Sequence, residues 1–359
     1  MNFQVSELAR TTGISRSTIS RALNRPESVA PETLSAVHSA ARSLNMDPRK
    51  RSRRGRPRKL PVAAGNGRLG VWFVGSGEKD AHRFLGEQIA FLQAASVAAG
   101  ASFRLLFSAN ADEIPIDIRQ QECEAILLQG AQPSPAVLDT IAGLPSVWVM
   151  TRKSPDYPGD YVEPDNEANG RMAADYLMGR KHSHLAYISV EPEYPAYARR
   201  EASFTARVRE LGGTVARITA LPHIETVHLL PPPSEETGDQ LAAQLFACAP
   251  APTAIYMPDS GATGVLYRSI RRSGADPAQF DWIIGNYSPF IHTQLDPIPA
   301  AIDINLQTII ATAVQTVLWR ATNPGLPGRI GIQISPALRG VETASPLNGS
   351  RKSHLVSKV

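Results

Sequence analysis

The segment from Arg49 to Lys59 holds eight positive charges and no acidic residue. Cationic runs of this kind bind the phosphates of nucleic acids, and arginine also enters the narrow minor groove of A·T-rich DNA. Glycine lets a backbone approach the floor of that groove, and proline keeps the chain extended. The residues expected to contact DNA there are Arg54, Gly55, Arg56, Pro57 and Arg58. Arg56 is expected to lie deepest; the alternative is a solvated run that grips phosphates without sequence preference.

A second group of polar side chains comes directly before the basic run, in a helix-turn-helix pattern. Gly13 supplies a tight turn, and Ser15 can cap a helix that runs to Leu23. On such a helix an arginine can hold guanine O6 and N7, while serine hydroxyls suit bases or phosphates. The candidate DNA-binding residues are Ser15, Arg16, Ser17, Ser20, Arg21 and Asn24. The alternative is a helical hairpin whose arginines only add solubility, but the basic run that follows favours DNA binding.

The positive charge of the chain is concentrated at one end. Residues 1–60 contain 13 Lys and Arg against four acidic residues, whereas the remaining residues contain 24 against 29. A basic head on a mildly acidic body is expected to orient on a polyanion rather than adhere to it over its whole surface.

The spacing of apolar residues divides the chain into four segments. Residues 1–47 predict short helices, and residues 48–67 predict a linker. Over 68–340, short apolar runs alternate with amphipathic segments, which is typical of doubly wound parallel α/β sheets. Two lobes with a cleft, crossing near 161–166 and 286–304, are favoured over one sheet of seven or eight strands. The tail, 341–359, is expected to be disordered.

Eight apolar runs in the third segment are candidate strands. They are Leu69–Val74, Phe103–Phe107, Ala125–Leu128, Val147–Met150, Leu185–Ser189, Val215–Thr219, Ala254–Met257 and Trp282–Gly285. Candidate helices lie between them, near 83–99, 134–143, 167–180, 195–211, 236–248, 260–273 and 305–321.

Residues 3–48 resemble the DNA-binding headpiece of LacI/GalR-type bacterial transcription repressors. The motifs that carry the resemblance are Gly13–Asn24, Ser28-Val29-Ala30-Pro31-Glu32-Thr33 and Leu44-Asn45-x-x-Pro48. Further matches follow at Asp165-Asn166-x-x-x-Gly170, Pro252-Thr253-Ala254-Ile255 and Ile334-Ser335-Pro336. The resemblance therefore covers nearly the whole chain, and its most specific part is the headpiece.

The resemblance implies a homodimer that reads a near-palindromic operator in double-stranded DNA, with a periplasmic-binding-protein-like core. It places Arg16 and Ser17 at the base-reading pair of the recognition helix, and Arg21 at a further DNA contact. The family usually continues after Pro48 with a hinge helix, but no Ala-x-x-Leu pattern of the kind that marks it follows here. Here the segment from Arg54 to Lys59 instead resembles an AT-hook, which implies a preference for an A·T-rich operator centre.

The resemblance also implies a small-molecule effector between the lobes. The positions it assigns to ligand binding are Arg152, Arg199, Arg200, Asp259, Asn286 and Tyr287. The chain departs from the family at Pro258 and Tyr287, where an asparagine and an aspartate usually hold sugar hydroxyls. The effector is therefore expected to differ from a typical sugar, or to be absent. Whether Arg152 and Arg200 meet an anion or are solvated surface residues stays open.

No catalytic, metal-binding or cofactor-binding set of residues emerges, so an enzyme is not expected. Cys123 and Cys248 follow no metal or redox spacing, and no apolar run reaches the roughly 18 residues of a membrane span. The expectation is a cytoplasmic, nucleoid-associated transcription regulator, most simply a repressor. The alternative is an architectural protein with A·T preference that senses no ligand.

Overall fold

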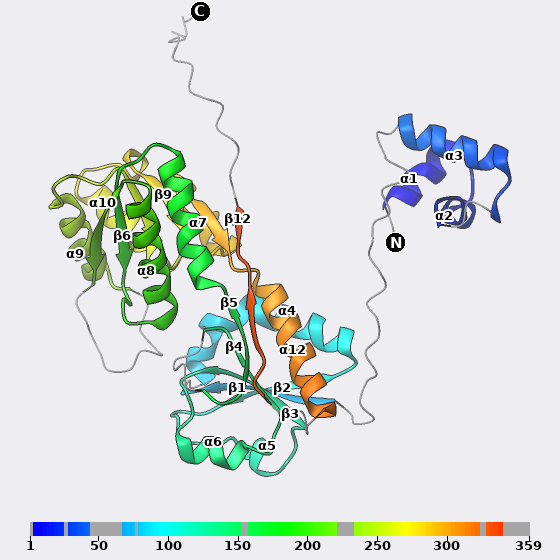
Figure 1. Ribbon diagram of the computed structural model, residues 1–359, viewed down its shortest axis with the longest axis horizontal. Helices are drawn as coiled ribbons and strands as arrows, with labels where there is room; N and C mark the ends of the chain where they lie inside the picture. The colour runs from blue at the N-terminus through cyan, green and yellow to red at the C-terminus, as the bar shows by residue number, and fades with distance from the viewer. Residues whose placement is uncertain are drawn as a thin grey trace, which may run out of the picture. The chain divides into compact units, whose positions relative to one another are not determined.

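The computed structural model describes residues 3–24, 28–43, 67–75, 78–151, 157–220, 233–323 and 328–339. They belong to two compact units, Met1–Leu60 and Pro61–Val359 (Figure 1). The basic run, the ligand candidate Arg152 and the tail lie outside the described residues.

The N-terminal unit is a bundle of three helices, α1 (Phe3–Thr12), α2 (Arg16–Asn24) and α3 (Pro31–Ser43). Apolar residues at helical spacing bury a small core between them, made of Leu8, Ile19, Ala22, Val37 and Ala41. Gly13 adopts a left-handed φ of 68° between α1 and α2, a conformation that glycine enters without steric cost. The helix-turn-helix headpiece is therefore present, as the sequence predicts.

The first lobe of the core is built on a six-stranded sheet with the order β11-β5-β4-β3-β1-β2, in which all neighbouring strands are parallel. The strands are β1 (Arg68–Val74), β2 (Ser102–Phe107), β3 (Ala125–Gly130), β4 (Ser146–Val149), β5 (Asp160–Pro164) and β11 (Gly331–Ile334). One face packs against α4 (Glu78–Ala99) and α12 (Leu306–Thr322). The other packs against α5 (Ile116–Arg119) and α6 (Pro135–Ile141).

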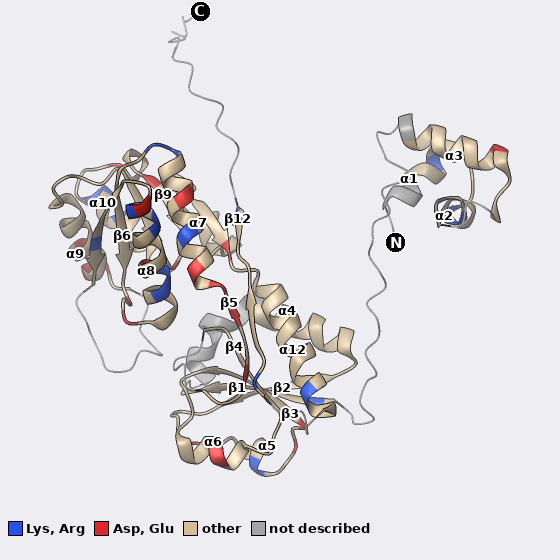
Figure 2. Cartoon of the chain, viewed as in Figure 1, with Lys and Arg blue, Asp and Glu red and all other residues tan. Residues whose placement is uncertain are grey.

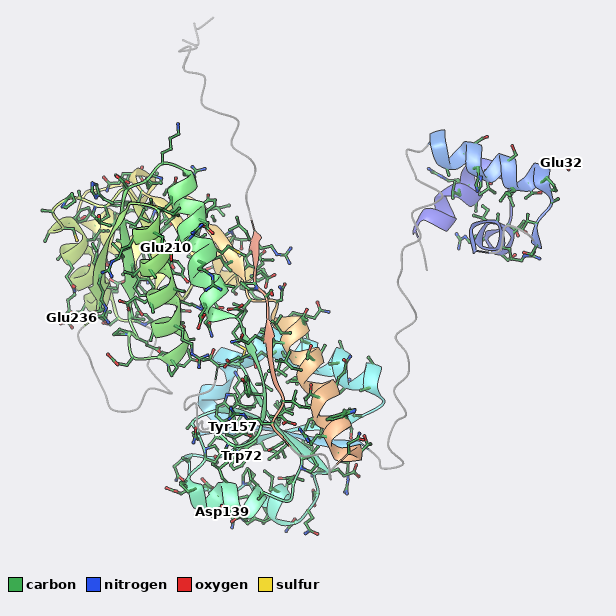
Figure 3. The ribbon with its side chains drawn as sticks, viewed as in Figure 1. Glu32, Trp72, Asp139, Tyr157, Glu210 and Glu236 are labelled. Atoms are coloured by element: carbon green, nitrogen blue, oxygen red, sulfur yellow. The ribbon has the colours of Figure 1, made fainter. Side chains whose placement is uncertain are left out.

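Buried aromatic side chains fill the α6 side of this lobe. Trp72 and Tyr157 lie in one apolar cluster, on the side of the sheet where α6 carries Asp139 (Figure 3). The rings of Trp148 and Tyr157 are 5.2 Å apart, and burial raises the pKa of Tyr157 to about 12. This cluster gives the first lobe a core of its own.

The second lobe has a sheet of the same size, with the order β12-β10-β9-β8-β6-β7. Its strands are β6 (His184–Ser189), β7 (Thr214–Thr219), β8 (Ala254–Met257), β9 (Asp281–Ile284), β10 (Ala300–Asp303) and β12 (Ala337–Arg339). Only β12, paired with β10, runs antiparallel among the pairs that the described residues form.

Helices cover both faces of the second sheet. The pair α7 (Asn166–Gly179) and α8 (Pro195–Glu210) packs on one face, and the pair α9 (Glu235–Phe246) and α10 (Thr263–Arg272) packs on the other. Two short elements, η2 (Pro277–Gln279) and α11 (Pro289–His292), flank β9. A headpiece of helices with a core of two doubly wound α/β lobes confirms the predicted fold class.

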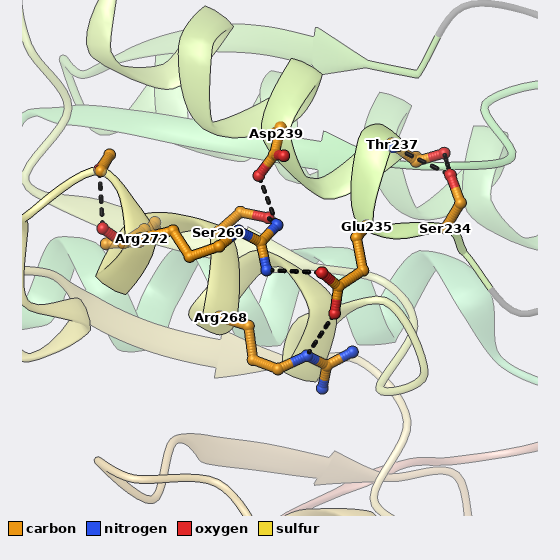
Figure 4. Close-up of polar contacts among 9 residues, drawn as sticks. Ser234, Glu235, Thr237, Asp239, Arg268, Ser269 and Arg272 are labelled. Atoms are coloured by element: carbon orange, nitrogen blue, oxygen red, sulfur yellow. Dashed lines mark hydrogen bonds and ion pairs between the residues drawn. The ribbon is translucent and has the colours of Figure 1, made fainter.

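Polar contacts hold the outer helix pair α9–α10 together (Figure 4). Glu235 on α9 pairs with Arg268 at 3.6 Å and with Arg272 at 3.0 Å, and Asp239 pairs with Arg272 at 2.5 Å. Exposed ion pairs of this kind contribute little to the free energy of folding. The apolar residues buried beneath α9 and α10 therefore supply most of the stability of this helix pair. The network orients α9 against α10.

The chain passes between the two sheets three times. The crossings are at Asp165, at Ile304–Asn305 and at Ser335–Pro336, between β5 and α7, β10 and α12, and β11 and β12. The third crossing was not among the two that the sequence predicts. It arises because β11 and β12, two short strands, lie on different sheets.

Candidate DNA-binding and ligand sites

The exposed side of α2 carries the first candidate site. Ser15, Arg16, Ser17 and Arg21 are exposed, whereas Ile19 and Ala22 point into the headpiece core. The side chains of Ser20 and Asn24 lie outside the described residues, as do Arg54, Gly55, Arg56, Pro57 and Arg58. The structure thus places two arginines and a serine of the predicted set on one solvent-facing side of a short helix.

Local hydrogen bonds fix where α2 begins. The Oγ of Ser15 accepts a hydrogen bond from the backbone N–H of Thr18 at 3.2 Å, which is the contact expected of an N-cap. Before the turn, the hydroxyl of Thr12 donates to the carbonyl of Leu8 at 2.7 Å and accepts from the N–H of Ile14 at 3.3 Å. Ser15 therefore positions Arg16 and Ser17 at the first turn of α2.

The second candidate site lies at the carboxyl ends of β8 and β9 in the second lobe, where doubly wound sheets bind ligands. Arg200 on α8 is 2% exposed. Its Nη1 donates to the carbonyls of Pro258 at 2.7 Å and Gly285 at 3.0 Å, and its Nε donates to Oδ1 of Asn166 at 2.9 Å. The view of Arg200 as a solvated surface arginine is therefore wrong, because its guanidinium is buried among protein acceptors.

Arg199, the neighbouring candidate, is also engaged with the protein. Its Nη1 donates to Oε1 of Glu163 at 3.0 Å, and Glu163 is fully buried. Figure 2 shows that both α7 and α8 carry basic (blue) and acidic (red) positions. Both arginines are thus parts of internal hydrogen-bond networks.

Asp259, half-buried after β8, has a carboxyl whose pKa is raised by burial. One carboxylate oxygen accepts from the N–H of Gly261 at 3.2 Å, so the side chain also shapes the turn into α10. Asn286 and Tyr287 follow β9. The Oδ1 of Asn286 is buried and has no hydrogen-bond partner among the described residues, and the Tyr287 ring meets His292 edge-on at 5.2 Å.

Two tyrosines that the sequence analysis missed lie beside these residues. Tyr194 and Tyr197 form an edge-to-face pair with ring centroids 4.8 Å apart, and Arg200 lies over the Tyr197 ring at 5.7 Å. Burial raises the pKa of Tyr194 to about 12. The signal in the sequence was the place of Tyr194, directly before the helix-opening Pro195 and after a strand.

Among the described ranges, no group of three or more His, Cys, Asp or Glu residues could hold a metal ion. Within the same ranges no helix has the length and hydrophobicity needed to cross a membrane. The geometry defines a helix-turn-helix domain followed by a core of two parallel-sheet lobes.

A family model matches the N-terminal domain. Residues 4–49 match the family model of bacterial regulatory proteins of the lacI family. No curated protein matches the chain in sequence.

Solved structures resemble the fold of most of the chain. The transcriptional regulator CelR, in its cellobiose complex, is 18% identical over 94% of this chain and 98% of its own, with a TM-score of 0.59. The Lac repressor bound to ONPG is 16% identical with the same coverages and a TM-score of 0.58. A LacI transcriptional regulator from Rhodococcus species is 21% identical over 76% of this chain and 96% of its own, with a TM-score of 0.60.

The N-terminal residues are therefore a helix-turn-helix domain of the lacI family, and the chain has the fold of LacI-type transcription regulators.

Proposed function

We propose that the protein is a sequence-specific transcription regulator, acting as a repressor, that binds a near-palindromic operator as a homodimer. The observation that carries the proposal is the exposed side of α2, where Arg16, Ser17 and Arg21 face solvent within a lacI-family domain. Arginine and serine at the first turns of a recognition helix suit the base edges of the major groove.

The basic run contributes a second contact with DNA in this proposal. Its Arg-Gly-Arg-Pro core suits a narrow minor groove, so the operator centre is A·T-rich. The remaining cations of the run add sequence-independent affinity through phosphates.

The homodimer is supported by the surface of α4. Over 88–99, where the side chains of α4 are described, the exposed residues are Ile89, Ala90, Gln93, Ala94, Val97 and Ala98. The solvent face of a surface helix normally carries charges, and the part of α4 from 88 to 99 has none. Val97 is 65% exposed, and in the second lobe Phe290 and Ile298 are 69% and 65% exposed. Apolar patches of this kind mark protein interfaces, and we assign them to a second copy of the chain.

The core is proposed to receive a small-molecule effector at the carboxyl ends of β8 and β9. Its side chains there are Asp259, Asn286 and Tyr287, joined by Tyr194 and Tyr197. CelR and the Lac repressor are solved with cellobiose and with ONPG, respectively. Tyrosine at 287 and proline at 258 favour a ligand with more aromatic or apolar surface than a simple sugar.

The second candidate function is a ligand-independent, A·T-preferring DNA-binding protein. The observation that favours it is the engagement of Arg199 and Arg200 in internal contacts, which leaves fewer donors for a ligand. A thermal-shift screen of metabolites separates the two, because a ligand at 100 times its Kd stabilises the native state by about 2.7 kcal/mol.

The experiment that tests the proposal is the selection of bound sequences from a random DNA pool with the full chain. At about 150 mM salt, counterion-driven binding is weakened and base reading dominates the selection. A palindrome with an A·T-rich centre is expected. A diffuse A·T preference without symmetry would contradict the regulator and support the architectural candidate.

A further inference from the structure

Two of the three guanidinium nitrogens of Arg200 are already used by the protein. Nη1 donates to the carbonyls of Pro258 at 2.7 Å and Gly285 at 3.0 Å, and Nε donates to Oδ1 of Asn166 at 2.9 Å. A guanidinium grips a carboxylate or a phosphate through two parallel N–H groups on adjacent nitrogens. Because Nε and Nη1 are occupied, neither such edge of Arg200 is available. The buried arginine is therefore not arranged to hold an anion.

The donor that remains on Arg200 is Nη2. It forms no hydrogen bond with the described residues. It is also not one of the side-chain atoms that are enclosed without a partner, so it keeps contact with solvent. Nη2 can therefore donate to an oxygen of a bound molecule without breaking any contact of the protein.

Asn286 offers a second polar group beside this donor, because it follows Gly285, whose carbonyl Arg200 holds. The carboxamide of Asn286 forms no hydrogen bond with the described residues, although its Oδ1 is buried. Buried polar atoms in native proteins nearly always have a partner, so this group is suited to receive a polar group from outside the protein. A carboxamide is both acceptor and donor, whichever way its oxygen and nitrogen are turned.

The charges already present at the site offset one another. Burial raises the pKa of the Asp259 carboxyl, whereas the nearby Arg200 acts to lower it. The three groups that accept hydrogen bonds from Arg200 are all neutral. A bound anion would lie near the Asp259 carboxylate, and a bound cation would lie near the buried guanidinium. Both are unfavourable where solvation is poor, so the site favours an uncharged ligand.

The turn that carries Asn286 is held from behind. Nδ2 of Asn169 donates to the carbonyl of Gly285 at 2.9 Å, and the hydroxyl of Tyr256 donates to Oδ1 of Asn169 at 2.7 Å. Both side chains are fully buried. A backbone that is fixed before the ligand arrives loses little entropy on binding, which favours affinity.

Aromatic rings lie against the same groups. Arg200 is placed over the ring of Tyr197 at 5.7 Å, and Tyr194 meets Tyr197 edge-on at 4.8 Å. Tyr287 follows Asn286 directly. Aromatic side chains supply flat apolar surface, which suits a planar ligand.

We infer that the effector is an uncharged, planar molecule with an amide group, whose carbonyl oxygen accepts from Nη2 of Arg200 and whose N–H donates to the carboxamide of Asn286. The inference rests on the proposed function, because it names the chemical class of the effector at the ends of β8 and β9. In this arrangement Arg200 and Asn286 are the residues that determine specificity.

The test uses three probes that share one benzene ring and differ in the group that the ring carries. Benzamide carries an amide, benzoate an anion and benzylammonium a cation. Saturation-transfer-difference NMR titrations with the full chain, in the absence of DNA, give a Kd for each probe. We expect benzamide to bind more tightly than either charged probe by about tenfold or more, because a charge of either sign is left uncompensated at the site.

The informative variant is Asn286→Leu, which removes the carboxamide and keeps a side chain of similar size. It should fold, because the carboxamide has no hydrogen bond within the described residues to lose. We expect it to bind benzamide about tenfold more weakly than the parent. The matched control is Gln120→Leu, which removes an exposed carboxamide from the first lobe and should leave the Kd for benzamide unchanged.

A charged probe that binds as tightly as benzamide overturns the inference, and so does the absence of benzamide binding. Unchanged benzamide binding by Asn286→Leu overturns it as well. DNA does not enter this measurement. A chain that selects its palindrome but binds no benzamide keeps the DNA-binding role and loses the inferred effector class, whereas one that binds benzamide but selects no DNA loses the proposed function alone.

Discussion

Arg16 is the side chain on which the proposed recognition of DNA bases depends most directly. It stands at the first turn of α2, behind the Ser15 cap, and its side chain is exposed. An arginine in this place can form two hydrogen bonds with one guanine, whereas contacts with phosphates carry no sequence information. The two kinds of contact differ in what their loss does to specificity.

Arg16→Ala is expected to relax the base preference at one position in each half-site, at a cost of about 1–3 kcal/mol in discrimination. Selection profiles of the variant and the parent measure this change. Arg10→Ala, which removes an exposed arginine of α1 outside the recognition helix, is the control and should leave the base preference unchanged. If Arg16→Ala instead lowered the affinity for all sequences equally, Arg16 would contact phosphate rather than a base.

At the scale of elements, all eight strands predicted from apolar runs are present, each within two residues of its predicted ends. Buried parallel strands are nearly continuous apolar runs, so their sequences are conspicuous. The strands that were missed are β5, β10, β11 and β12. The sequence of β5 hides it, because Asp160 and Glu163 interrupt its apolar residues and are paired in the interior with distant arginines, Arg320 and Arg199.

The two candidate sites could be predicted from the sequence to different degrees, because one is formed by neighbouring residues and the other by residues far apart in the sequence. The residues of α2 are contiguous, so helical spacing alone separates the exposed from the buried side. The surroundings of Arg200 come from Asn166, Pro258 and Gly285, which lie 34 to 85 residues away in the sequence. Contacts of this range depend on strand order, which local patterns do not specify.

The packing of α7 on α8 depends on Gly170. A Cβ at this position would overlap the carbonyl oxygen of Arg200 and the hydroxyl of Ser203. We expect Gly170→Ala to destabilise the core by roughly 1–3 kcal/mol, as overpacking does. Gly179→Ala at the end of the same helix meets no atom within 4 Å and should be neutral or stabilising by up to about 1 kcal/mol. Urea midpoints of the two variants measure the difference, and equal midpoints would contradict the tight contact.

The basic linker makes a separate prediction. Arg56→Ala is expected to reduce the advantage of operators with an A·T-rich centre over operators with a G·C-rich centre, because a narrow groove attracts arginine most strongly. Dissociation constants on two operators that differ only in the centre measure it. Lys59→Ala keeps the Arg-Gly-Arg-Pro core and serves as the control. Equal loss on both operators would assign Arg56 to phosphates.

At the scale of the whole molecule, binding to a near-palindromic operator requires two copies of the chain, since two recognition helices are needed for two half-sites. Val97→Glu places a charge on the stretch 88–99 of α4, which has no charged residue, and we expect it to shift the protein from dimer toward monomer. Ala136→Glu adds the same charge to an exposed position of α6 and should leave the dimer intact. Light scattering during size-exclusion chromatography measures both, and an unaffected dimer for Val97→Glu would remove α4 from the interface.

The central claim is that the full chain distinguishes one DNA sequence from others. Its most direct test is the ratio of the Kd for a shuffled duplex to the Kd for the selected palindrome, at about 150 mM salt. Site-specific regulators reach ratios on the order of 10³ or more, and we expect a ratio in that range. A ratio near one, with both affinities falling steeply as salt rises, would contradict the account and identify a binder of DNA in general.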